Sequence, residues 1–198
     1  MDELVQITEV KARGKCLFRI PKSGGRVLWQ LTNLCNYKCL YCIFSSGPKK
    51  IEGELSLEEV CSVLDQLHKA NYRSIKFTGG EPLVRNDLIE ILKHANGLGL
   101  KFDLSTNGSL LDAEMARELA QLDPEMIHVS LDGGDQLTHD SIRGLGTFQK
   151  TVAGIKLLTA AGVNLRIGCV VFRANEDLLP SVVSLCHELK ANEVIFSR

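Results

Sequence analysis

The chain has 198 residues, of which 44% are hydrophobic and 24% charged, a composition typical of a single globular domain. Its formal net charge of −1 excludes the strong positive charge by which proteins bind nucleic acid or anionic membrane surfaces. The sequence contains no run of about 18 apolar residues, the length that spans a membrane. The acidic stretch MDELVQITEV lacks the apolar centre of a signal peptide, so we expect a cytoplasmic protein.

Short runs typical of β-strands alternate with amphipathic helical stretches, which is the pattern of a parallel α/β fold. Six strands are predicted over residues 27–31, 74–78, 101–105, 126–131, 164–172 and 193–196. Five helices are predicted between them, one starting at residue 56, one over residues 87 to about 95, and three over residues 112–122, 147–161 and 178–190. An additional strand over residues 16–20 is expected to pair with the first of the six across a turn at residues 21–25.

The start of the first helix carries a specific signal. Ser56-Leu-Glu-Glu59 is a capping box, in which the Ser56 hydroxyl accepts from the backbone N–H of Glu59 and the Glu59 carboxylate accepts from that of Ser56. The segment between the first strand and Ser56 is therefore a loop, and it contains three closely spaced cysteines.

Cys35, Cys39 and Cys42 stand in this loop with the spacing C-x3-C-x2-C. Thiolates are the usual ligands of iron–sulfur clusters, and three of them would hold three corners of a [4Fe–4S] cube and leave the fourth iron open. An open metal position can bind a substrate or a cofactor, whereas a cluster that only transfers electrons is normally closed by a fourth cysteine. The spacing therefore indicates chemistry at the iron.

Two other uses of cysteine are less consistent with the sequence. A structural zinc site usually has two paired ligand knuckles, and no second Cys/His pair with that spacing occurs. The other cysteines stand singly, as Cys16, Cys61, Cys169 and Cys186. A disulfide framework disagrees with the odd count of seven and with a chain long enough to bury its own core. An iron–sulfur site is the preferred interpretation, and a zinc site is its alternative.

The cysteine spacing, with the aromatic Tyr41 directly before the last cysteine, resembles the signature of the radical S-adenosylmethionine (radical SAM) enzymes. The resemblance implies a [4Fe–4S] cluster held by Cys35, Cys39 and Cys42, and SAM as the second cofactor, chelating the open iron through its amino and carboxylate groups. One electron, from a reductant such as flavodoxin or ferredoxin, then splits SAM and yields a 5′-deoxyadenosyl radical that takes a hydrogen atom from a substrate. The implied fold is a partial (βα)6 TIM-like barrel of parallel strands.

In such barrels the functional residues follow the carboxyl ends of the strands, and two polar motifs of this chain fall there. Gly79-Gly80-Glu81-Pro82 follows the second predicted strand and resembles the family motif that binds the amino group of SAM. Ser105 and Asn107, at the end of the third strand, resemble the family's ribose-binding residues. Alone, each motif would be an ordinary turn, but their order after the cysteines favours SAM binding.

A third motif follows the fourth predicted strand. Ser130-Leu-Asp132-Gly133, with a later His-Asp-Ser-Ile-Arg143-Gly, resembles the SLDG…HD..RG pattern of a subgroup that holds molybdenum-cofactor cyclases, haem-modifying enzymes and SPASM proteins. The resemblance implies that Ser130 and Arg143 contact the SAM carboxylate, a group that a guanidinium binds well. The alternative for Arg143 is an exposed arginine at a helix end.

The fifth predicted strand has a less specific role. The resemblance implies that adenine packs against Tyr41 and against the backbone of residues 168–170. The apolar sequence of this strand is equally typical of a buried core strand. Cys169 and His128 are therefore expected to be packed residues, not a ligand and a base.

The resemblance covers residues 25–198, so residues 1–24 are expected to form an N-terminal extension. The predicted pattern stops at the sixth strand, whereas the family barrel continues with a sixth helix and a C-terminal region that shapes the substrate pocket. The chain is then either a truncated piece or fragment of a longer protein, or a chain that works with a partner or with its own copy. The sequence does not identify the substrate, a small molecule or a peptide. A non-catalytic iron–sulfur or zinc module and an electron carrier are the competing functions, and neither needs the polar motifs at the strand ends.

Overall fold

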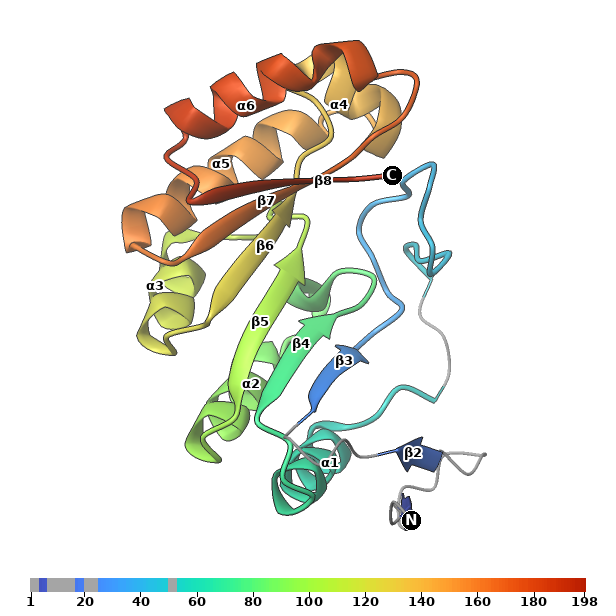
Figure 1. Ribbon diagram of the computed structural model, residues 1–198, viewed down its shortest axis with the longest axis vertical. Coiled ribbons are helices and arrows are strands. Elements are labelled where there is room, and N and C mark those ends of the chain that lie inside the picture. Colours follow the sequence, from blue (N-terminus) through green and yellow to red (C-terminus); the bar gives the residue numbers. More distant parts are fainter. Residues whose placement is uncertain (1–3, 7–16, 20–24, 50–52) are drawn as a thin grey trace.

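Six parallel strands form the central sheet of the computed structural model, which describes residues 4–6, 17–19, 25–49 and 53–198. The strands lie side by side in chain order: β3 (Arg26–Gln30), β4 (Ser74–Thr78), β5 (Lys101–Thr106), β6 (Met126–Ser130), β7 (Leu165–Val170) and β8 (Glu193–Ser197). Every neighbouring pair is parallel. Figure 1 shows how strongly the sheet twists from β3 to β8. The predicted α/β class and the six predicted strands are confirmed.

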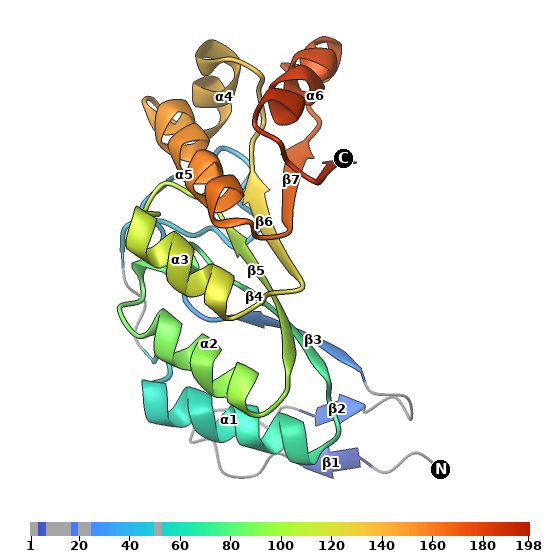
Figure 2. The ribbon, with the colours of Figure 1, turned by 90° about the vertical axis from the view of Figure 1, so that its left-hand side faces the viewer.

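Helices connect the strands and cover one face of the sheet. They are α1 (Leu57–Lys69), α2 (Leu88–Gly97), α3 (Ala113–Gln121), α4 (Gln136–Arg143), α5 (Thr147–Ala161) and α6 (Leu179–Glu188), with single 3-10 turns η1 (Pro82–Val84) and η2 (Glu176–Leu178). Figure 2 shows α1, α2, α3 and α5 stacked along the same face of the sheet. Within the described residues, no helix is long and apolar enough to cross a membrane.

The capping box at the start of α1 is confirmed. The backbone N–H of Ser56 donates to the Glu59 carboxylate at 2.9 Å, and the N–H of Glu59 donates to the Ser56 hydroxyl at 3.2 Å. Two N–H groups of the first turn thus have partners, which fixes where the cysteine loop ends.

Helix α4 is absent from the sequence prediction. It has eight residues, and its sequence QLTHDSIR lacks the apolar stripe by which longer helices are identified. Asp135 begins it by accepting from both the N–H and the hydroxyl of Thr138 at 2.9 Å, and Gly144 ends it with φ 115°. Arg143, the last residue of this helix, is buried, with 7% exposure. The alternative expectation of an exposed arginine at a helix end is therefore wrong.

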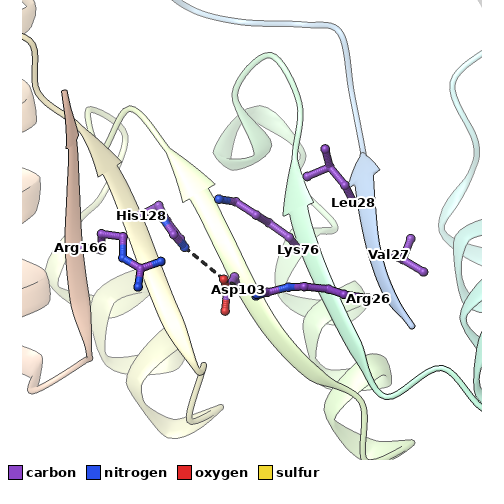
Figure 3. Close-up of a pocket in the computed structure, with 7 residues that line it drawn as sticks. All are labelled: Arg26, Val27, Leu28, Lys76, Asp103, His128 and Arg166. Atoms are coloured by element: carbon purple, nitrogen blue, oxygen red, sulfur yellow. Dashed lines mark hydrogen bonds and ion pairs between the residues drawn. The ribbon is translucent and has the colours of Figure 1, made fainter. Parts of the chain in front are cut away.

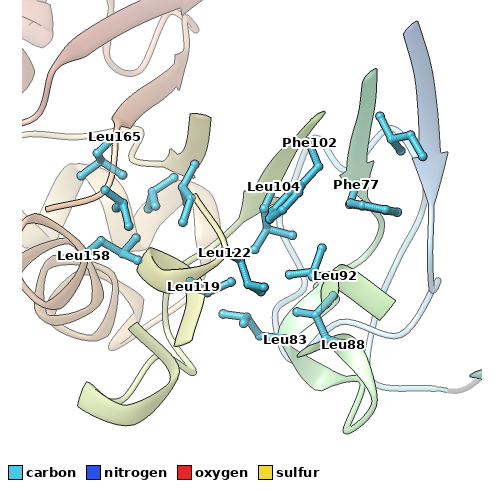
Figure 4. Close-up of a cluster of buried hydrophobic side chains, with 14 of the residues drawn as sticks. Phe77, Leu83, Leu88, Leu92, Phe102, Leu104, Leu119, Leu122, Leu158 and Leu165 are labelled. Carbon is cyan, nitrogen blue, oxygen red and sulfur yellow. The ribbon is translucent and has the colours of Figure 1, made fainter. Parts of the chain in front are cut away.

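The hydrophobic core lies between the sheet and the helices. Alternate strand residues, among them Phe77, Phe102 and Leu104, are at most 1% exposed and pack toward Leu92 of α2 and Leu119 of α3, as Figure 4 shows. Cys169 is fully buried in the same core, as expected. Successive strand residues point to opposite faces, so the residues between these core positions face away from the helices. That inner face is polar.

The N-terminal segment departs from the prediction. β1 (Leu4–Gln6) and β2 (Leu17–Arg19) form a separate antiparallel pair, with Leu4 opposite Arg19. The expected pairing of residues 16–20 with the first strand of the sheet is wrong for the described residues 17–19, because their ladder partner is β1. Residues 16 and 20 and most of the expected turn lie outside the described residues.

Candidate functional site

A cavity of about 420 Å³ lies at the carboxyl ends of the strands, beneath the cysteine loop. All the sequence-predicted site residues but one line it: Cys35, Cys39, Tyr41, Cys42, Gly79, Gly80, Ser105, Asn107, Ser130 and Arg143. They come from the loop after β3, from the ends of β4, β5 and β6, and from α4, so the fold gathers segments more than 100 residues apart. We call this space the cysteine cavity.

The cysteine loop is held to the rest of the chain by backbone hydrogen bonds. The N–H of Cys35 donates to the carbonyl of Gly47 at 2.9 Å, and the N–H of Leu40 donates to the carbonyl of Ile142 in α4 at 3.1 Å. These bonds fix both arms of the loop, so the positions of its thiols depend on α4, the helix that the sequence prediction lacks.

The thiols stand in a partly buried, hydrogen-bonded setting. Backbone N–H groups of Tyr37 and Ser46 point at the sulfurs of Cys35 and Cys42, at 3.4 and 3.3 Å. Burial raises the pKa of Cys35 to about 11 and raises that of Cys39 as well. Burial thus disfavours free thiolates here, whereas a bound metal deprotonates its thiol ligands outright. N–H donors to sulfur are also among the features that set the potential of iron–sulfur clusters.

The residues present fit a [4Fe–4S] cluster. In the described part of the chain, no three side chains of His, Cys, Asp or Glu are grouped closely enough to hold a single metal ion. A cube distributes its thiolates over different irons, so three thiols around one cavity are sufficient and need not meet at a point.

Gly79 and Gly80 let the end of β4 approach the cysteine loop. The N–H of Gly80 donates to the carbonyl of Thr32 at 2.7 Å. A Cβ on Gly79 would lie 2.6 Å from that same carbonyl oxygen, and one on Gly80 would meet the backbone of Leu34 even more closely. The absence of side chains at these positions is therefore required for packing, and it also leaves their backbone facing the cavity.

Glu81 is the predicted site residue that does not line the cavity. It is fully buried, and its carboxylate accepts from the Thr106 hydroxyl and the Asn107 N–H, both at 2.6 Å, and from the Leu83 N–H at 3.0 Å. Burial raises the pKa of Glu81, and these hydrogen bonds oppose the rise. The oxygens of this carboxylate are turned into the protein, where they join the ends of β4 and β5, and the role of Glu81 in binding the SAM amino group stays a prediction.

Asn107 connects the end of β5 to the cysteine loop. Its side-chain Nδ2 donates to Asn36 Oδ1 at 2.9 Å, and its side-chain Oδ1 accepts from the N–H and hydroxyl of Ser109 at 2.9 and 2.6 Å. Ser105, two residues earlier, lies beside His128 in the sheet and faces the same cavity. The structure thus brings together both residues predicted to bind ribose.

Asp132 is a buried residue behind the cavity wall, and the sequence analysis assigned it no role. Its Oδ2 accepts from Arg143 Nε at 2.5 Å and from the Tyr41 hydroxyl at 2.6 Å, and its Oδ1 accepts from the Val170 N–H at 2.8 Å. It is fully buried. Its place in Ser-Leu-Asp-Gly was visible, but its partners on other segments were not.

Arg143 is therefore positioned by Asp132. Its guanidinium also contacts the Tyr41 hydroxyl and lies 5.5 Å from the centre of the Tyr41 ring. Burial lowers the pKa of Arg143, but Asp132 and Tyr41 outweigh burial and hold it above its ordinary value, so the group stays charged. A guanidinium has five N–H donors, of which Asp132 takes the one on Nε and the Tyr41 hydroxyl one on Nη2, so the remaining donors of this cavity-lining residue are available to an anionic ligand.

Aromatic and backbone surfaces complete the cavity. Tyr41, Gly168 and Val170 line the cavity, and the ring of Phe172 packs against that of Tyr41 with 4.9 Å between the ring centres. Phe172, to which the sequence analysis assigned no role, thus supports Tyr41 without lining the cavity. His128 also lines the cavity, but its Nε2 lies 3.0 Å from Asp103 Oδ2, which agrees with the expected packed role.

Comparison with known proteins gives a consistent result. The family model described as Radical SAM superfamily matches residues 29–185. The AdoMet-dependent heme synthase of Oleidesulfovibrio alaskensis is 34% identical over 166 residues, which are 83% of this chain and 43% of that protein.

Two solved structures share the fold. SuiB of Streptococcus suis bound to S-adenosylmethionine has a TM-score of 0.77 at 19% identity, over 88% of this chain and 40% of that one. The structure of anSMEcpe with bound AdoMet and Cp18Cys peptide has a TM-score of 0.71 at 26% identity, over 86% and 49%. The chain thus spans less than half the length of each of these proteins.

Proposed function

Because the chain belongs to the radical SAM superfamily, we propose that it holds a [4Fe–4S] cluster through Cys35, Cys39 and Cys42, binds SAM in the cysteine cavity and uses the pair for hydrogen-atom abstraction. When bound, the cluster supplies the electron that splits SAM into methionine and a 5′-deoxyadenosyl radical. The observation that carries the proposal is the common cavity of the three thiols and the polar strand ends. An electron carrier or a structural module would not need the second set of residues.

The chain's own groups fit the parts of SAM. The exposed backbone at Gly79 and Gly80 suits the ammonium group, since carbonyl oxygens accept its hydrogens. Arg143, with the Ser130 hydroxyl, suits the carboxylate. Ser105 and Asn107 suit the ribose hydroxyls, and Tyr41 with the backbone of β7 suits the flat adenine ring.

Asp132 and Glu81 act through other residues. Asp132 holds the guanidinium of Arg143 and the ring of Tyr41 at one wall of the cavity. Glu81 holds the N–H of Asn107 and the neighbouring Thr106 hydroxyl at another. Both carboxylates are fully buried and would fix their partners before a ligand arrives, which reduces the ordering cost of binding.

The substrate class stays open between a small molecule and a peptide. The 34% identical relative is a heme synthase, and the 26% identical structure contains a bound peptide. An external one-electron reductant, such as flavodoxin or ferredoxin, is part of the proposal because no redox group other than the cluster is implied by the described residues.

Cluster content and SAM cleavage test the proposal. Anaerobically reconstituted protein should contain about four irons and four sulfides per chain, and with dithionite and SAM it should release 5′-deoxyadenosine. Cys39→Ala should lose both, whereas the matched control Cys61→Ala, on α1, should keep both. Stoichiometric zinc in protein purified without oxygen, or equal loss in the two variants, would contradict the proposal.

A further inference from the structure

A second, smaller cavity lies on the same inner face of the sheet, nearer the amino ends of the strands. It has a volume of about 220 Å³, and its lining includes Arg26, Lys76, Asp103, His128 and Arg166. Lys76 and His128 line the cysteine cavity as well, so the two spaces adjoin along β4 and β6. A ligand in the cysteine cavity could therefore extend into the smaller one, which we call the basic cavity.

Positive charge dominates the basic cavity. Figure 3 shows Arg26 of β3 reaching Asp103 of β5, Lys76 of β4 extending across β5 above it, and Arg166 of β7 on the other side. Asp103, only 3% exposed, forms an ion pair with Arg26, and its Oδ2 lies 3.0 Å from Nε2 of His128. Burial lowers the pKa of His128, which favours the neutral ring. Three cations thus face one carboxylate across the cavity.

Lys76 is a cation of this cavity that forms no ion pair with the described residues. Arg26 is paired with Asp103 and Arg166 with Glu193, whereas Lys76 has neither an ion pair nor a side-chain hydrogen bond to any described residue. It is half-buried at the junction of the two cavities. Burial lowers the pKa of Lys76, and the two arginines lower it further while Asp103 opposes them. A bound anion would offset the positive field that the two arginines create at Lys76.

We propose that Lys76, together with Arg26 and Arg166, binds a carboxylate group of the substrate, whose reacting end lies in the cysteine cavity. The role as a substrate subsite rests on the proposed function, because that function makes the adjoining cavity the reaction site. Planar guanidinium groups and an ammonium group are the donors that suit a carboxylate. Thr78, which lines the cysteine cavity, is two residues beyond Lys76 on β4, a rise of about 7 Å. Lys76 is thus the next residue of the inner face after Thr78, in the direction of the basic cavity.

A purely structural ion network is the competing explanation. Such a network would balance its charges internally, because an unpaired buried charge costs stability and an apolar residue of similar size would cost less. Asp103 and Glu193 are each paired with an arginine, and among the described residues no carboxylate forms an ion pair with Lys76. The imbalance is at the wall shared with the cysteine cavity, where a ligand can reach it.

Binding of a small polycarboxylate tests the proposal without any enzymatic reaction. Propane-1,2,3-tricarboxylate would be titrated calorimetrically into the whole 198-residue chain at low salt, with pentane-1,5-diamine as the cationic comparison. Lys76→Met should weaken carboxylate binding about tenfold, as loss of one charge-assisted contact does. Lys156→Met, the same change on the exposed outer side of α5, should leave it unchanged. Asp103→Asn, which removes the opposing carboxylate, should tighten it.

Absence of saturable carboxylate binding by the wild-type chain would overturn the proposal, as would equal weakening by Lys76→Met and Lys156→Met. Arg166→Gln gives a second variant, expected to weaken binding in the same direction, if Lys76→Met does not fold as judged by its circular dichroism. The outcome is separable from that of the proposed function. Lys76-dependent binding without SAM cleavage by the wild type would contradict the function and keep the anion site, and cleavage without such binding would do the reverse.

Discussion

Replacing Asp132 with asparagine should destabilise the chain severely, because it leaves the guanidinium of Arg143 buried without its counter-charge. The side chains of Arg143 and Asp132 are 8% and 0% exposed, and Nε and Oδ2 lie 2.5 Å apart. An exposed pair would contribute less than about 1 kcal/mol. Removal of one partner from a buried pair costs about 3–5 kcal/mol, and burial is what places this pair in the second class. Asparagine can still accept from Val170 N–H, so we expect a loss of about 3 kcal/mol, the lower end.

Urea unfolding of cluster-free protein at pH 7, followed by circular dichroism, measures this loss. Asp65→Asn is the matched control, because the side chains of Asp65 and its partner His94 are 44% and 34% exposed, and it should change the free energy of unfolding by less than about 0.5 kcal/mol. Adding Arg143→Met to Asp132→Asn should recover part of the loss, because no uncompensated charge then remains. A loss below about 1 kcal/mol for Asp132→Asn, or simple additivity in the double variant, would refute the argument.

Three further predictions concern pH, the core and the cysteine loop. Burial and the nearby Arg143 lower the pKa of His139 to about 4, so between pH 6.5 and 4 the unfolded chain binds a proton that the folded chain does not. The free energy of unfolding should therefore be highest above pH 6.5 and fall by on the order of 3 kcal/mol as the pH drops through this window. In urea titrations at several pH values, His139→Gln should flatten this dependence. Leu92→Ala, at a fully buried position, should lower the free energy of unfolding by about 2–5 kcal/mol, whereas Leu137→Ala, at 83% exposure, should change it little; equal effects would contradict the described core. Gly80→Ala should destabilise the chain by about 1–3 kcal/mol and reduce cluster content, because its Cβ would collide with backbone, whereas Gly97→Ala, with nothing within 4 Å, should be tolerated; a stable, fully loaded Gly80→Ala protein would contradict the close approach.

The sequence predicted best what depends on neighbouring residues. The alternation of Ile75, Lys76 and Phe77 marks a strand with one apolar face, and the capping box marks the start of α1, because both signals lie within a few positions. The cysteine spacing and the polar strand ends were visible in the same way. Parallel strands place their carboxyl ends at one edge, so the cavity could be anticipated from strand order alone.

Hydrogen-bond and ion-pair partners that lie far apart in the sequence could not be predicted. Asp132 accepts from residues 41, 143 and 170, and the sequence gives no indication of which cation a buried carboxylate meets. Glu81 could equally have pointed into the cavity, and its inward turn depends on donors at the end of β5 and just after it, 25 and 26 residues away. The pairing of β2 with β1 is similar, since any exposed strand edge can satisfy its backbone groups.

The response of the reduced cluster to SAM tests the central claim most directly. The electron paramagnetic resonance spectrum of the dithionite-reduced, reconstituted protein would be recorded with and without saturating SAM, for the wild type and for Arg143→Ala. Binding of SAM at an open iron should change the wild-type spectrum, and Arg143→Ala should need a higher SAM concentration for the same change. A wild-type spectrum that saturating SAM leaves unaltered would contradict SAM ligation and favour an electron carrier.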